Sequence, residues 1–187
     1  MMVILLFTEI ALASDTLKTK IAIIAKSGKS ERSLKHHDRL KESELIKIYM
    51  QSKNPDYYYI INSNKSNISL IKNGQFTSDS LFVYPLKESK YIVFDGKNSV
   101  ENILIVISQN KVAELDSLFK SGQSNNIENF QFVEQQLSKK SKVLVSDKIE
   151  PIYNLGGNVR AINPTGFRTY TGTGIIFNKY EFYIKTN

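Results

Sequence analysis

The stretch Ile103-Leu104-Ile105-Val106-Ile107 decides the fold class, because it is apolar on both of the faces that a β-strand presents. Successive side chains of a strand point to opposite sides. Ile103, Ile105 and Ile107 therefore share one face, and Leu104 and Val106 share the other. A strand with only one covered face would alternate apolar and polar residues. We expect a central strand that is covered on both sides.

Short apolar runs before this strand alternate with turn residues, as in β-strands joined by tight connections. The expected strands are Thr19–Ala25, Leu45–Met50, Tyr57–Asn62, Ile68–Ile71, Leu81–Tyr84 and Tyr91–Phe94. The expected turns are Asn54-Pro55-Asp56, Asn62–Asn67, Asn73-Gly74 and Asp95-Gly96. The polar segment Ser27–Glu44 is expected to be a loop or an irregular arm. Strands at about ten-residue spacing with turns between them favour a sandwich or a barrel.

Helical spacing replaces this alternation after the central strand. One expected helix carries Val112, Leu115, Leu118 and Phe119 and stops near Gly122; a second, capped by Asn126, carries Ile127, Phe130, Val133 and Leu137. Turn residues then follow at Gly156-Gly157, Asn163-Pro164 and Gly166. The segment Thr173–Lys185 alternates again, with Ile176, Tyr180, Phe182 and Ile184 inward and Lys179, Glu181 and Lys185 outward. It is either one long strand or a hairpin broken at Asn178-Lys179.

These patterns predict one globular domain over residues 14–187. Its fold class is mainly β, β-sandwich-like and mostly antiparallel, with two helices after the central strand. An α+β arrangement is the alternative. We expect both helices on one side or end of the sheet core.

The first fourteen residues, MMVILLFTEIALAS, have the features of the rear part of a secretory signal peptide. Met1–Phe7 is apolar, and Ala11-Leu12-Ala13 is a small-x-small site that predicts cleavage after Ala13. A basic n-region is missing, which a start codon placed too far downstream would explain. The alternative is an ordinary N-terminal strand. Residues 1–13 thus predict an exported protein, periplasmic or secreted, with no transmembrane span, since Glu9 interrupts the run well short of the ~20 apolar residues a span needs.

The charge of the chain does not favour nucleic-acid binding. The formal net charge is +7, but most of it comes from lysines scattered along the chain, and the arginines are Arg32, Arg39, Arg160 and Arg168. Recognition of phosphates and bases favours arginine. The cluster Lys139, Lys140 and Lys142 resembles a solvated connector. The chain has no cysteine, so it holds neither a disulfide nor a lipid-modified Cys.

Two polar motifs of the arm have a chemical interpretation and a simpler one. Gly28-Lys29-Ser30 matches the end of a phosphate-binding loop, but the full loop needs a glycine at position 23, which is Ile23. His36-His37-Asp38 carries metal-ligand side chains, but neighbouring residues rarely converge on one ion without distant partners. We expect exposed loop residues in both places, and we predict neither a cofactor nor a metal ligand.

No residue is predicted to be catalytic. A Gly-x-Ser-x-Gly elbow does not occur, and Ser108 is expected to end a strand. Asp56, Asp79 and Asp95 are expected to be turn residues, although paired carboxylates would allow a hydrolase.

Two further features admit a binding role beside a structural one. Tyr57 and Tyr59 share one strand face and Tyr58 lies on the other; we expect sandwich core, although an exposed face would stack sugars or peptide. Arg160 would anchor an anion, but a structural hydrogen bond to loop carbonyls is the simpler expectation.

A series of motifs carries a family resemblance over about residues 44–120. The series is Leu45–Met50, Asp56–Asn64, Ile68–Gly74, Phe82–Pro85, Phe94–Gly96 and Ile103–Ser108, with Gly156–Ala161 and Tyr180–Ile184 matching the Arg-containing turn and last strand of longer members. In this order the motifs resemble a bacterial domain family of unknown function, DUF4384. Lys72 departs from the family, which usually has Pro before that asparagine.

Members of this family are often appended to caspase-like peptidases, kinases or envelope proteins, and this sequence shows no such catalytic partner. The resemblance therefore implies a stand-alone accessory module of the bacterial cell envelope, with no known reaction to transfer. We therefore expect a non-enzymatic binding module with an unknown protein or envelope partner. The alternatives are an envelope hydrolase that uses loop carboxylates and a cytoplasmic regulatory domain.

Overall fold

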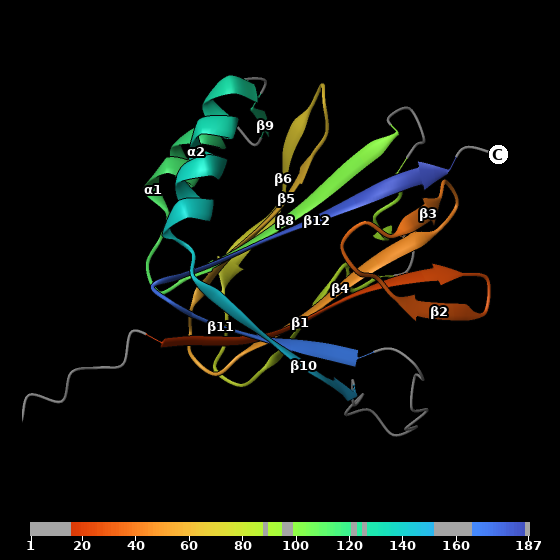
Figure 1. Cartoon of the computed structure of the whole chain (residues 1–187), viewed down its shortest axis with the longest axis horizontal. Coiled ribbons are helices and arrows are strands. Elements are labelled where there is room, and N and C mark those ends of the chain that lie inside the picture. Colours follow the sequence, from red (N-terminus) through yellow and green to blue (C-terminus); the bar gives the residue numbers. More distant parts are fainter. Residues whose placement is uncertain are drawn as a thin grey trace, which may run out of the picture.

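The computed structural model describes residues 16–87, 90–94, 99–120, 123–124, 127–151 and 166–185. Two six-stranded sheets pack face to face, and two helices cover the outer face of one of them (Figure 1). The predicted fold class is confirmed: the protein is mainly β, sandwich-like and almost entirely antiparallel.

The first sheet contains the N-terminal strand at its centre. Its strands are β1 (Thr16–Ser27), β2 (Ser30–Ser33), β4 (Leu45–Ser52), β7 (Leu81–Tyr84), β10 (Val143–Pro151) and β11 (Gly166–Thr173). They lie in the order β10-β11-β1-β4-β7, and β2 pairs with β1.

The second sheet is built around the central strand that the sequence predicts. Its strands are β3 (Arg39–Lys41), β5 (Tyr57–Ser63), β6 (Ile68–Gln75), β8 (Val100–Ser108), β9 (Gln123–Ser124) and β12 (Ile175–Lys185), in the order β3-β12-β8-β5-β6-β9. Only β3 and β12 pair in parallel among the described strands.

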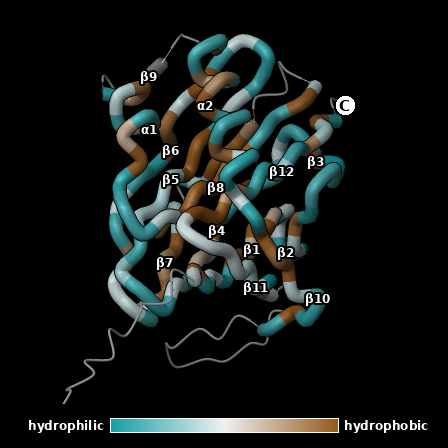
Figure 2. Tube along the Cα trace, turned by 60° about the vertical axis from the view of Figure 1, so that its left-hand side comes forward, coloured by the Kyte–Doolittle hydropathy of each residue, from teal (hydrophilic) through white to brown (hydrophobic). Residues whose placement is uncertain are grey.

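The strand β8 is covered on both faces, as predicted. Ile103, Ile105 and Ile107 lie in the core between the sheets, whereas Leu104 and Val106 face the helices. Full burial of one such side chain contributes about 1.5–3 kcal/mol, so this strand anchors both interfaces. Figure 2 shows hydrophobic residues gathered along β8 and its neighbours and hydrophilic ones along the outer loops.

The helices α1 (Ala113–Leu118) and α2 (Ile127–Lys140) occupy the predicted positions. They bury Leu115, Phe130 and Leu137 against the second sheet. Each isolated helix is short enough to be marginal in water, so its stability comes from this packing.

Several boundaries differ from the predictions. The arm over residues 27–44 contains β2 and β3, so it is not wholly irregular. Tyr91–Phe94 is not a strand; Ile92 makes one isolated bridge to Ile46, because β7 already occupies the edge of β4 over residues 48–51.

Two predicted turns are also wrong. Asn73-Gly74 lies within β6, where Gly74 faces the ring of Tyr58; a Cβ at Gly74 would lie 2.7 Å from that hydroxyl oxygen. Gly166 is the first residue of β11. The chain turns at Gly174, whose φ of 71° suits glycine, from β11 of the first sheet into β12 of the second, and Asn178-Lys179 continues β12.

Other predictions lie outside the described residues. They concern the signal segment 1–13, Asp95-Gly96, Gly122, Asn126, Gly156–Ala161 and Asn163-Pro164. Within the described ranges, neither helix has the length and apolar character needed to cross a membrane.

Candidate functional site

A pocket forms where β1 exchanges one neighbour for another. β1 pairs with β11 through residues 16–21 and with β2 through residues 24–27, on the edge opposite β4. The end of β2 and the start of β11 meet there, and the Gly166 N–H donates a 3.1 Å hydrogen bond to Ser33 Oγ. The break in pairing leaves a cavity of about 190 Å³ that extends between the sheets towards β12.

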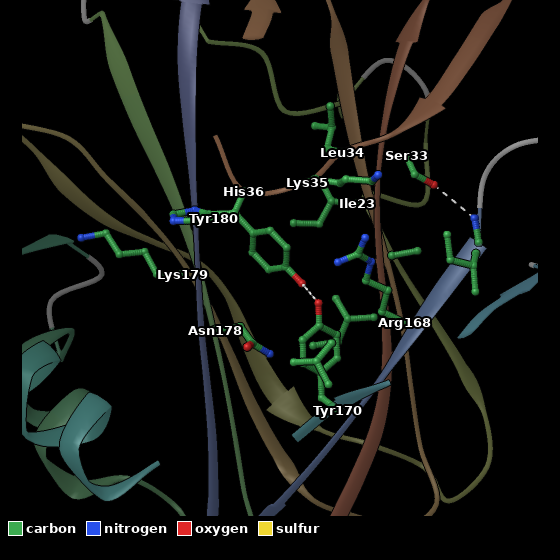
Figure 3. Close-up of a pocket in the computed structure, with 15 residues that line it drawn as sticks. Ile23, Ser33, Leu34, Lys35, His36, Arg168, Tyr170, Asn178, Lys179 and Tyr180 are labelled. Carbon is green, nitrogen blue, oxygen red and sulfur yellow. Dashed lines mark hydrogen bonds between the residues drawn. The ribbon is translucent and has the colours of Figure 1, made fainter. Parts of the chain in front are cut away.

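The lining of this pocket, which we call the Arg168 pocket, combines an apolar wall with hydrogen-bonding groups (Figure 3). The apolar side chains are Ile21, Ile23, Leu34, Val145 and Ile149; the polar ones are Ser33, Lys35, His36, Arg168, Tyr170, Asn178, Lys179 and Tyr180. Neither Asp nor Glu is among the described lining residues.

Arg168 lies at the middle of the pocket, with its guanidinium group between Ile23 and Tyr170 (Figure 3). Its side chain is half-buried and has no hydrogen bond or ion pair to any described residue. Arg32 contrasts with it: that guanidinium lies 3.1 Å from the Glu44 carboxylate and 2.7 Å from the Arg39 carbonyl oxygen. Arg168 is thus a partly desolvated cation without a counter-charge in the part of the chain that the structure describes.

Two tyrosine hydroxyls close the floor of the pocket. Tyr170 of one sheet and Tyr180 of the other are joined by a 2.7 Å hydrogen bond (Figure 3). Burial raises the pKa of both groups, and the charge of Arg168 acts in the opposite direction. Both hydroxyls therefore stay protonated at neutral pH. Their mutual bond uses one proton and leaves the other for a ligand.

Asn178 contributes a buried donor without an acceptor. Its Nδ2 atom is enclosed and makes no hydrogen bond. An unsatisfied buried polar group costs about 1–3 kcal/mol, so such groups in native proteins call for an explanation. A ligand acceptor in the adjacent pocket would satisfy this amide.

His36 completes the donor set at the rim. Its Nδ1 accepts the backbone N–H of Glu181 at 3.0 Å, so the proton of the neutral ring lies on Nε2. Burial and the neighbouring His37 lower the pKa of His36, which favours the neutral ring at neutral pH.

The other residues of the histidine motif point to separate partners. His37 Nδ1 lies 3.3 Å from Glu181 Oε1, and its ring stacks on Tyr183 with centroids 5.8 Å apart. Asp38 accepts the Lys35 backbone N–H at 2.8 Å. Within the described ranges, no three His, Cys, Asp or Glu side chains gather around a common centre.

The phosphate-loop motif has a different structure from the one its sequence suggests. Gly28 and Lys29 form the exposed turn between β1 and β2, with Ser27 paired to Ser30 and Gly28 at a φ of 59°. The expected exposed loop is confirmed, since no helix follows whose N-terminus could hold a phosphate.

Of the predicted turn carboxylates, the structure describes Asp56 and Asp79, and they differ in burial and bonding. Asp56 is only 3% exposed and accepts a 2.6 Å hydrogen bond from Ser52 Oγ, and burial raises its pKa. Asp79 is exposed at a φ of 56°. Ser108 is the buried last residue of β8, and its hydroxyl donates to the Asn110 carbonyl. Asp95 and Arg160 lie outside the described residues.

The tyrosine run presents its two predicted faces, but the face of Tyr57 and Tyr59 packs against the helices and not in the predicted sandwich core. Tyr58 lies between the sheets, against Phe82 at a centroid distance of 4.5 Å. Tyr59 faces the helices; its hydroxyl donates to Asp116 at 2.9 Å and accepts the Val112 N–H at 3.0 Å. Tyr57 packs at the margin of the same helix-side cluster.

The sequence analysis missed the main residues of the pocket. The alternation predicted Tyr180 to point inward, but Arg168 stood out only as one of four arginines, and Asn178 only as a place where the last strand either breaks or continues. The alternation of side chains along a strand could have identified Asn178, because it shares the inward face of Ile176 and Tyr180. An inward amide and an inward arginine on consecutive strands, here β12 and β11 of opposite sheets, indicate a polar site inside a sandwich.

The described geometry is therefore a half-open pocket with one unpaired guanidinium, several neutral donors and an apolar wall. Comparisons with protein-family models, with curated proteins and with solved structures find no match to this chain.

Proposed function

We propose that this chain is a non-enzymatic binding module of the bacterial cell envelope that holds an organic anion in the Arg168 pocket. The observation that carries the proposal is the half-buried guanidinium of Arg168, which has no partner among the described residues and lies among described lining residues that include no carboxylate. Removing a charge from water is costly unless a counter-charge meets it. An anionic ligand supplies that charge.

The neighbouring groups support the same ligand class. Asn178 Nδ2, the spare tyrosine proton and His36 Nε2 are all donors, whereas an anion offers acceptors. Hydrogen bonds to charged groups contribute about 1.5–3 kcal/mol, more than those between neutral groups.

The hydrolase alternative receives less support from the same geometry. Asp56 is buried and bonded to Ser52, so it has no access to a substrate. Asp79 lies in a surface pocket beside Lys18, Lys20 and Lys53, and no second acid is among the described residues that line this pocket. Most glycoside hydrolases need two cooperating carboxyl groups on one substrate.

Binding can be tested on the full chain by isothermal titration calorimetry with butanoate and hexanoate at neutral pH and low salt. Arg168→Met keeps an unbranched side chain and removes the charge, so we expect affinity to fall about tenfold or more. Arg39→Met is the matched control, because Arg39 is exposed on β3 and does not line the pocket. Equal affinities in the parent and Arg168→Met would refute the proposal.

The envelope location rests on the signal-like segment 1–13 and on the family resemblance. Mass spectrometry of the protein from cell fractions checks it, since export predicts a mature N-terminus at Ser14. An intact Met1 on protein from the cytoplasmic fraction would contradict the location and favour the cytoplasmic regulatory alternative.

A further inference from the structure

We infer that the anion held by Arg168 is a monocarboxylate with an apolar tail and no ammonium group. The inference rests on the proposed function and narrows its ligand to one chemical class. Three features of the pocket carry it: the number of desolvated charges, the lack of acids, and the position of its apolar side chains.

The pocket offers one desolvated positive charge. Arg168 is half-buried, whereas Lys35 and Lys179 are exposed, and Lys179 is already paired with Glu134 at 2.7 Å. A single partly enclosed cation matches a monoanion, because the second charge of a phosphate dianion would lack a buried counter-charge. The planar guanidinium fork also fits a carboxylate through two parallel hydrogen bonds.

The lack of acids excludes zwitterions. An amino acid would bring its ammonium group into the same cavity, beside Arg168. Since neither Asp nor Glu is among the described lining residues, that group would have no counter-charge and would be repelled. The ligand is therefore a simple acid and not an amino acid.

The apolar wall continues from the interior to the mouth. Ile21 and Ile23 are buried inside, while Val145 and Ile149 of β10 line the mouth and are 47% and 49% exposed. Pairing sets Val145 opposite Tyr170 and Ile149 opposite Arg168, so all four side chains share the inner face of the sheet. A tail that leaves a carboxylate on Arg168 therefore passes along these two residues.

The irregularity of β10 favours this tail over a paired strand. The register shifts between Val145 and Ile149, so residues 146–148 do not continue the ladder. Such bulges, with charges like Asp147 and Lys148 beside them, discourage strand addition at a sheet edge. The half-exposed side chains at the mouth are thus available to a small apolar group.

The test is a chain-length series of acids from acetate to octanoate, titrated into the full chain by calorimetry. We expect the Kd to tighten by about fourfold per methylene while the tail still lies against the pocket wall, which corresponds to about 0.8 kcal/mol for each buried methylene. 2-Aminohexanoate should bind at least tenfold more weakly than hexanoate. Butyl phosphate should also bind more weakly than a monocarboxylate of the same chain length.

Variants of β10 locate the tail. Ile149→Ser and Val145→Ser should reduce the gain per methylene, so they should weaken octanoate binding by a larger factor than acetate binding. Leu144→Ser is the matched control: Leu144 is 77% exposed on the same strand but does not line the pocket, so its series should match the parent. Far-ultraviolet circular dichroism and the melting temperature verify that each variant is folded.

The failures can be told apart. A Kd that depends on Arg168 but not on chain length, or tighter binding of butyl phosphate or 2-aminohexanoate, would overturn this inference and leave the proposed function standing. Binding of N-acetyl-leucine as tight as hexanoate would transfer the site to peptide C-termini and also overturn the inference. If no acid in the series binds in a way that depends on Arg168, both this inference and the proposed function are overturned.

Discussion

The helix-covered face of the second sheet and the Arg168 pocket differ in how well their polar groups are satisfied. Under the helices, the Tyr59 hydroxyl has both a donor and an acceptor within the chain, Val112 N–H and Asp116. In the pocket, Arg168 lacks a counter-charge among the described residues, and Asn178 Nδ2 lacks an acceptor. Satisfied groups stabilise a fold, whereas unsatisfied ones lower its stability and are retained where a ligand completes them. Substitutions in the two regions should therefore have effects of different size and sign.

The largest effect is expected beneath the helices. Phe130→Ala removes a ring that is 3% exposed and packs edge-on against Phe119 at 6.4 Å. We expect the free energy of unfolding to fall by about 3–5 kcal/mol in urea titrations. Phe132→Ala on the same helix is the control, because Phe132 is 63% exposed and should change stability by less than about 0.5 kcal/mol. Equal losses would mean that α2 does not pack as described.

A smaller loss is expected at the paired arginine. Arg32→Met leaves the buried Glu44 carboxylate without its main partner and should cost about 2 kcal/mol, whereas Arg168→Met without ligand should cost less than about 0.5 kcal/mol. Thermal unfolding of both variants measures the difference. A larger loss of stability in Arg168→Met than in Arg32→Met would show that Arg168 has a partner in the folded chain, and the contrast between the two arginines would disappear.

The pH dependence of Arg32→Met supplies a second measurement. Burial alone would raise the pKa of Glu44, but hydrogen bonds from Arg32 and the Lys41 N–H lower it below the ordinary 4.5. A depressed folded pKa gives stability that is present above pH 4.5 and is lost as the pH falls through the folded value. The difference between parent and variant should therefore shrink below about pH 4.5. A difference that stays constant through this window would contradict the assignment.

Tyr59→Phe should cost about 1–1.5 kcal/mol near neutral pH, because Val112 N–H and Asp116 lose a shared partner. Burial raises the pKa of Tyr59 to about 12, from 10 in the unfolded chain. The folded state thus binds the proton more tightly, and this contribution is lost as the pH rises from 10 to about 12. Urea titrations should show a shallower alkaline decline in the variant than in the parent. Tyr57→Phe, which removes a hydroxyl at the margin of the same cluster, should change the free energy of unfolding near neutral pH by less than about 0.5 kcal/mol.

The smallest effect has the opposite sign. Asn178→Leu replaces the unsatisfied amide by an apolar group of similar shape and should raise the free energy of unfolding by up to about 1 kcal/mol. The same variant should weaken hexanoate binding. A loss of stability would show that the amide already has a partner, and the contrast between the two regions would then rest on Arg168 alone.

The fold was predictable because burial leaves a periodic trace in the sequence. The two apolar faces of residues 103–107 predicted the strand that anchors both interfaces, and the helical spacing located α1 and α2. Local composition failed where long-range pairing decided the outcome. Asn73-Gly74 resembles a turn, but it continues β6 because the ring of Tyr58 needs a residue without a side chain opposite it.

The candidate site was much less predictable. Its residues come from β1, β2, β10, β11 and β12 and from the segment after β2, so they share no local motif. The site depends on one topological event, the exchange of neighbours along β1, which no window of sequence contains. The histidine motif attracted attention for its residue types, yet of its three residues only His36 lines the pocket.

The tyrosine pair has a consequence for how the pocket meets its ligand. Tyr170 and Tyr180 are ten positions apart on either side of the Gly174 turn, and their 2.7 Å bond joins two consecutive strands that belong to opposite sheets. The width of the cavity is therefore set within a short stretch of chain rather than by distant loops. A receptor whose aperture is fixed before encounter loses little entropy on binding, so ligand association should be fast and should proceed without rearrangement of the sheets.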